Sequence, residues 1–116
     1  MMTNSNKSQF QHLFISAQME VYNTAIEKGW WDDDRNDAEC IALMHSELSE
    51  ALEGMRHGNP ADDKIPAWTS IEAELADTVI RIMDFAQHHN YDIAGAILAK
   101  IEYNKSRPHK HGGKLF

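Results

Sequence analysis

The chain has 116 residues and a net charge of −7, from 18 acidic and 11 basic residues. This length corresponds to a single domain, 1–116, and the acidic balance argues against nonspecific binding to nucleic acid, which needs a basic footprint. No apolar run approaches the roughly 20 residues that span a bilayer, so no membrane association is expected. The single Cys40 cannot form an internal disulfide, which fits a cytoplasmic protein.

Four segments are expected to be helical, and no segment shows the alternation of polar and apolar residues that is typical of a strand. In chain order, the expected helices cover about 8–28, 36–58, 69–89 and 92–106. Gly29 is expected to end the first helix, and Pro108 cannot continue the last one. Each later helix is preceded by Asn, Asp, Ser or Thr, which are residues that commonly cap the start of a helix. The pattern predicts an all-α fold, a helical bundle of three or four main helices with flexible ends at 1–7 and 109–116.

Each of the two central helices carries an apolar stripe that is expected to form the core. The stripes consist of Ile41, Met44, Leu48, Ala51, Leu52 and Met55 in the second helix, and of Ile71, Leu75, Val79, Ile82 and Ala86 in the third. Glu53 and Asp84 are expected on the opposite, solvated faces. Because a chain this short cannot cover all of its apolar surface, the bundle is expected to be completed by oligomerisation.

Two acidic pairs lie beside these stripes, Glu47 with Glu50 and Glu74 with Asp77. Residues three apart share a helix face, so two helices packed side by side would bring four carboxylates together. Such a group repels itself unless a hard cation lies within it, and Mg²⁺ or Mn²⁺ prefers oxygen ligands. The alternative interpretation is a solvated helix face, with Arg81 simply pairing with Asp77 four residues before it.

The order of these motifs, E-x-x-E and then E-x-x-D with residues 51–73 between them, resembles the signature of the MazG-like all-α nucleoside triphosphate pyrophosphatases. The resemblance extends over roughly 29–114. The segments that are most similar to the family are 44–51, 74–80, 100–108 and 111–114. Many members carry a further acid just before the first motif, where this chain has Ser46.

The resemblance implies Mg²⁺-dependent hydrolysis of a nucleoside triphosphate between its α and β phosphates, yielding a monophosphate and pyrophosphate and clearing unwanted nucleotides from the pool. It also implies that Glu47, Glu50, Glu74 and Asp77 are the metal ligands and catalytic residues. Similar proteins form homo-oligomers, and a tetramer built as a dimer of dimers is preferred here over a dimer. Relatives act on deoxynucleoside triphosphates, on dUTP or on phosphoribosyl-ATP. The sequence does not indicate which base this chain prefers.

Two further groups are candidates for binding the substrate. Lys100, Asn104 and Arg107 form one helical stripe that can bind phosphate, although cations near the end of a helix also simply complement its dipole. Trp30 and Trp31 precede the acidic helix, where at least one of them can stack on a nucleobase, the alternative being a packing anchor.

A different class of function also has to be considered, namely a non-catalytic helical module that binds nucleotide as a sensor or mediates assembly. A helix that serves assembly alone has no reason to keep acids beside its core, which favours the enzyme. Release of pyrophosphate with and without Mg²⁺ separates the two hypotheses.

Overall fold

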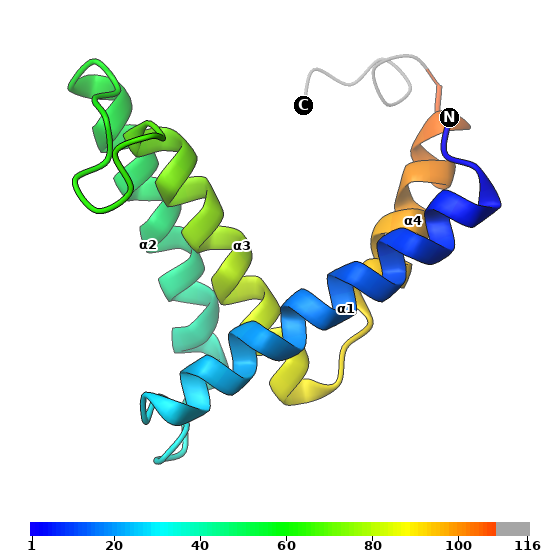
Figure 1. The fold of residues 1–116 in the computed structure, drawn as a ribbon, viewed down its shortest axis with the longest axis horizontal. Helices are drawn as coiled ribbons and strands as arrows, with labels where there is room; N and C mark the ends of the chain where they lie inside the picture. The colour runs from blue at the N-terminus through cyan, green and yellow to red at the C-terminus, as the bar shows by residue number, and fades with distance from the viewer. Residues whose placement is uncertain (109–116) are drawn as a thin grey trace.

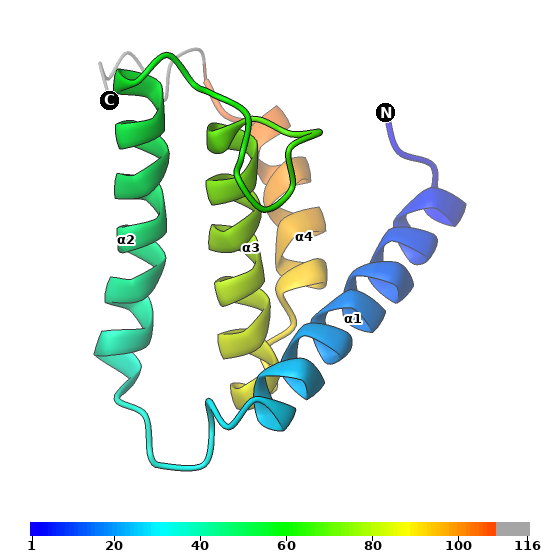
Figure 2. The same cartoon turned by 60° about the vertical axis from the view of Figure 1, so that its left-hand side comes forward.

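In the computed structural model, which is described for residues 1–108, the chain forms four α-helices (Figure 1). They are α1 (Asn4–Glu27), α2 (Asp37–Arg56), α3 (Ser70–His89) and α4 (Ile93–Lys105). α2 and α3 lie side by side and antiparallel, and α1 crosses the C-terminal half of α3 and contacts α4 (Figures 1 and 2). The only extended pairing within residues 1–108 is an isolated bridge from Ala61 to Thr69. The predicted all-α fold is confirmed.

The helix boundaries follow the local capping residues. The Asn36 side chain accepts from the Glu39 amide at 3.1 Å and starts α2. Thr69 begins α3 with a reciprocal capping box that involves Glu72. α3 ends at Asn90, whose φ of 59° is left-handed. The ends of these helices are therefore close to those that the sequence predicts.

α1 begins earlier than the predicted start near Ser8. The Thr3 hydroxyl accepts from the Asn6 amide at 3.0 Å, which satisfies one of the free donors at the helix start. Part of the segment 1–7, which the sequence predicts to be flexible, is therefore helical. The other end with this prediction, 109–116, lies outside the described residues. Gly29 ends the helix as expected, with a φ of 83°.

The apolar stripes of α2 and α3 are largely exposed within one chain, so at most of their positions they do not form the core of the single chain. At least 42% of the surface is exposed at Ile41, Leu48, Leu52, Met55, Leu75 and Val79. Of the predicted core residues, Ala51 and Ala86 are buried. The other buried residues of these two helices are small or polar, namely Cys40, Glu47, Ala73 and Thr78. Small residues permit close packing of helices, and this packing buries Glu47 and leaves the large apolar side chains exposed.

Apolar residues are distributed along all of the helices instead of forming one long run. None of the helices within residues 1–108 has the length and apolarity needed to cross a membrane.

Candidate functional site

Three of the four motif acids converge where α2 and α3 pack together. Glu47, Glu50 and Glu74 each offer a carboxylate oxygen, and these oxygens lie within 4.8 Å of one another. Glu47 is buried, Glu74 is half-buried and Glu50 is exposed, so the group reaches from the interface of the helices to solvent. The convergence that the i, i+3 spacing predicts is thus present for three acids, which are called the glutamate cluster below.

Asp77, the fourth predicted ligand, follows Glu74 on α3 and lines the adjoining pocket. It is not part of the glutamate cluster as the described residues define it. Partial burial and then the negative charge of Glu47 raise the pKa of Asp77, although Arg81 acts in the opposite direction. Asp77 therefore stands at the edge of the cluster and shares its electrostatic environment.

Glu74 is the most strongly perturbed acid. Burial, followed by hydrogen bonding with Glu47 and Glu50 and by their negative charge, raises the pKa of Glu74 to about 7. One of its oxygens, Oε2, is buried and has no hydrogen-bond partner within residues 1–108. A buried polar atom without a partner is costly, and a bound cation is one way to satisfy it. The oxygen-only donor set and this unsatisfied atom both fit a hard divalent cation.

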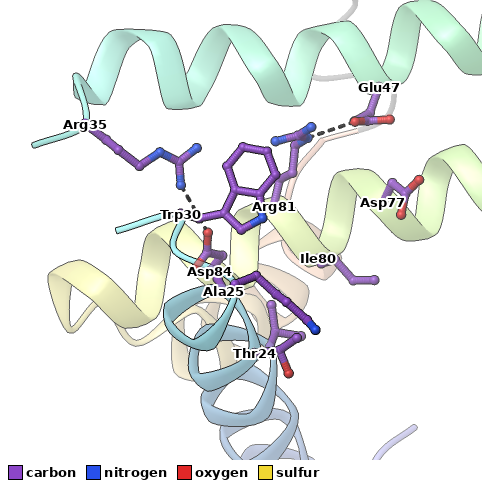
Figure 3. Close-up of a pocket in the computed structure, with 11 residues that line it drawn as sticks. Thr24, Ala25, Trp30, Arg35, Glu47, Asp77, Ile80, Arg81 and Asp84 are labelled. Atoms are coloured by element: carbon purple, nitrogen blue, oxygen red, sulfur yellow. Dashed lines mark hydrogen bonds and ion pairs between the residues drawn. The ribbon is translucent and has the colours of Figure 1, made fainter. Parts of the chain in front are cut away.

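Arg81 makes an ion pair across the two helices. Its Nε donates to Glu47 Oε1 at 2.8 Å (Figure 3). The sequence left open a pair between Arg81 and Asp77 on the same helix, but the observed partner is Glu47 on α2. The guanidinium still lies near enough to Asp77 to oppose part of the rise in the pKa of that carboxyl.

A pocket of about 300 Å³ adjoins the glutamate cluster, between α1, the loop that follows it, α2 and α3. Glu47, Asp77 and Arg81 line one end of it, and Trp30 and a charged pair line the other (Figure 3). The charged pair consists of Arg35 and Asp84, with 3.4 Å between Arg35 Nη1 and Asp84 Oδ2. The pocket therefore has an acidic end and an aromatic, polar end.

The two adjacent tryptophans have different environments. Trp31 stacks on His88 with 3.8 Å between ring centroids, and its Nε1 donates to Asp84 Oδ1 at 2.8 Å. Trp31 thus packs as an anchor, the alternative that the sequence left open. Trp30 is 60% exposed and lines the pocket, so its predicted stacking on a base stays a prediction.

The predicted phosphate-binding stripe lies elsewhere in the chain. Lys100 and Asn104 are on α4 and Arg107 follows it, and α4 contacts α1. None of the three lines the pocket. Lys100 and Arg107 lie over the Tyr103 ring, at 5.1 and 5.7 Å from its centroid. Within the described part of one chain they do not meet the acids, and phosphate binding by them stays a prediction.

Sequence reasoning missed the far end of the pocket. Asp84 is expected on a solvated face, but only 15% of its side chain is exposed, so that expectation is wrong. The spacing does indicate that Asp84 lies on the same side of the helix as the site, because Asp84 follows Asp77 by two helical turns and therefore shares its face. Arg35 carries no comparable signal, since it lies in a loop whose course depends on Trp31 and Asp84.

The chain matches no protein-family model, no curated protein and no solved structure in comparisons with known proteins. The resemblance to the MazG-like pyrophosphatases rests on the motif residues quoted above.

Proposed function

We propose that the chain is a MazG-like, Mg²⁺-dependent nucleoside triphosphate pyrophosphatase that produces a monophosphate and pyrophosphate. The observation that supports this best is the convergence of Glu47, Glu50 and Glu74, of which Glu47 also lines the acidic end of a pocket of about 300 Å³. Clusters of carboxylates bind hard cations, and hard cations in enzymes commonly act on phosphate esters and anhydrides. The biological role in this proposal is removal of unwanted nucleotides from the pool.

The cluster supplies the ligands for Mg²⁺, or for Mn²⁺ as a substitute, with Asp77 as the fourth acid at its edge. When bound, the cation neutralises the triphosphate, orients the α-phosphorus and makes the attacking water more acidic. One of the four carboxylates accepts the proton of that water.

The pocket provides the space for the nucleoside. Its volume of about 300 Å³ is at the small end of the range for ligand pockets. Asp77 and Asp84 are separated by about 10 Å along the axis of α3, using the helical rise per residue, so the pocket extends well beyond the phosphate end. The base then lies against Trp30, where an exposed indole face can stack on it.

The proposed enzyme is a homo-oligomer. The exposed apolar residues of α2 and α3 give the chain a surface that a second copy covers, and a homotetramer is preferred over a dimer.

The test is release of pyrophosphate from a panel of nucleoside triphosphates, with and without Mg²⁺. Glu50→Gln should abolish release, because it removes a ligand charge while keeping the shape. Glu53→Gln is the matched control, since Glu53 lies on the same helix, is 57% exposed and pairs only with Arg56 and His57 within residues 1–108. Unchanged release by Glu50→Gln, or no release from any triphosphate by the wild type, rules out the catalytic proposal. Binding of nucleotide without turnover supports the alternative of a non-catalytic module.

A further inference from the structure

Arg81 has an unusual position for a residue beside a candidate metal site. Within residues 1–108 it is the one basic side chain that forms an ion pair with any motif acid. Its partner Glu47 is buried, with only 11% of the side chain exposed. The positive charge of Arg81 therefore neutralises the acid that is least accessible to solvent.

The same guanidinium also faces the pocket. Arg81 lines it together with Glu47 and Asp77, so the guanidinium lies beside both one member of the glutamate cluster, Glu47, and the space in which a ligand fits (Figure 3). Within the described residues only its Nε is engaged, by Glu47. A guanidinium has five N–H donors, and its two terminal nitrogens match the oxygens of a phosphoryl group in a bidentate manner.

We propose that Arg81 is an exchangeable counter-ion, which neutralises Glu47 until a divalent cation binds and then turns to the phosphoryl oxygens of the nucleotide. This inference rests on the proposed function, because it assumes that the cluster binds metal and the pocket binds nucleotide. A divalent cation bound to Glu47 takes over the role of the guanidinium. The displaced Arg81 side chain is long and already lines the pocket. It can therefore form a new ion pair with a phosphate group of the nucleotide.

The exchange has a thermodynamic consequence that a merely structural Arg81 does not share. Because Arg81 competes for Glu47, it weakens the binding of metal alone. Because it binds phosphate once displaced, it strengthens the binding of nucleotide to the metal-loaded protein, so metal and nucleotide bind cooperatively. A structural Arg81 that only positions Glu47 acts in the opposite direction, and its removal weakens the binding of metal.

The experiment has two measurements on the full-length protein. The first is the dissociation constant of Mn²⁺ alone, by electron paramagnetic resonance titration. The second is the dissociation constant of α,β-methylene dATP and of α,β-methylene dCTP at saturating Mn²⁺. Arg81→Gln should bind Mn²⁺ at least about fivefold more tightly than the wild type, and at least one of the two analogues at least about fivefold more weakly. Arg56→Gln removes an equal charge from an exposed residue that pairs with Glu53, and it should change neither constant.

Arg81→Lys keeps the charge but loses the planar fork, and it provides the test if Arg81→Gln does not fold. The dissociation constant of this variant for Mn²⁺ should lie within about twofold of that of the wild type, and it should bind the nucleotide analogues more weakly than the wild type does. Equal or weaker binding of Mn²⁺ by Arg81→Gln overturns the counter-ion role. Wild-type affinity of Arg81→Gln or Arg81→Lys for both analogues overturns the transfer to phosphate.

The two proposals fail in different ways. A wild type that hydrolyses triphosphates, combined with Arg81 variants that leave both constants unchanged, refutes the exchange and leaves the pyrophosphatase intact. A wild type that hydrolyses none, combined with tighter Mn²⁺ binding by Arg81→Gln, refutes the enzyme and supports the competition at Glu47.

Discussion

Replacement of Glu74 by Gln should make the metal-free protein more stable at pH 8 and leave its stability unchanged at pH 4. Folding raises the pKa of Glu74 from 4.5 to about 7, because the carboxylate is partly buried beside Glu47 and Glu50. A raised pKa means that the folded state prefers the protonated form. The contribution of Glu74 to stability is therefore fully present below pH 4.5 and is lost as the pH rises through 7.

The size of the effect follows from the same shift. At about 1.36 kcal/mol per pKa unit, it corresponds to an upper limit of about 3 kcal/mol. Solvent screening at a cluster that reaches the surface reduces this to about 1–2 kcal/mol. The amide introduced by Glu74→Gln carries no charge at any pH, so the variant avoids the loss. The unfolding free energy of Glu74→Gln minus that of the wild type should rise from about zero at pH 4 to about 1–2 kcal/mol at pH 8.

The assay is urea unfolding in the presence of EDTA at a series of pH values, followed by circular dichroism. Addition of Mg²⁺ at pH 8 should reverse the order, because the wild type gains the free energy of metal binding and the variant gains less. Glu53→Gln, on the exposed face of α2, should follow the wild-type pH dependence. A Glu74→Gln curve parallel to that of the wild type, or a variant less stable at pH 8 in EDTA, would refute the electrostatic argument.

Four further substitutions test the site and the assembly. Glu50→Gln should lower Mg²⁺-dependent pyrophosphate release by at least about 100-fold without loss of stability, as measured by steady-state kinetics and thermal unfolding. Trp31→Ala should cost about 3 kcal/mol in urea unfolding, because it removes the stack on His88 and a hydrogen bond. Trp30→Ala should change stability by less than about 1 kcal/mol and instead raise the KM, since Trp30 is exposed at the pocket. Leu52→Glu should convert an oligomer into monomers in sedimentation velocity, and a wild type that already sediments as a monomer would contradict the proposed assembly.

The sequence by itself determined the helices and most of their ends. Asn36, Thr69 and Asp92 each cap the helix that follows, by a hydrogen bond to an amide three residues later. These contacts are local, so residue type and spacing are enough to predict them. The i, i+3 spacing also determined that Glu47 and Glu50 share one face of α2, because the helical repeat places them there whatever the helix packs against.

The tertiary structure decided which faces of the helices meet. The acidic and apolar stripes of α2 are neighbours on one helix, and periodicity does not say which of them is turned toward α3. Small residues such as Ala51 and Ala73 allow close contact and turn Glu47 inward, while Leu48 and Leu75 stay exposed. Tertiary structure likewise paired Arg81 with Glu47, since a contact between two helices depends on their relative rotation and axial shift, and neither is encoded in the spacing along one helix.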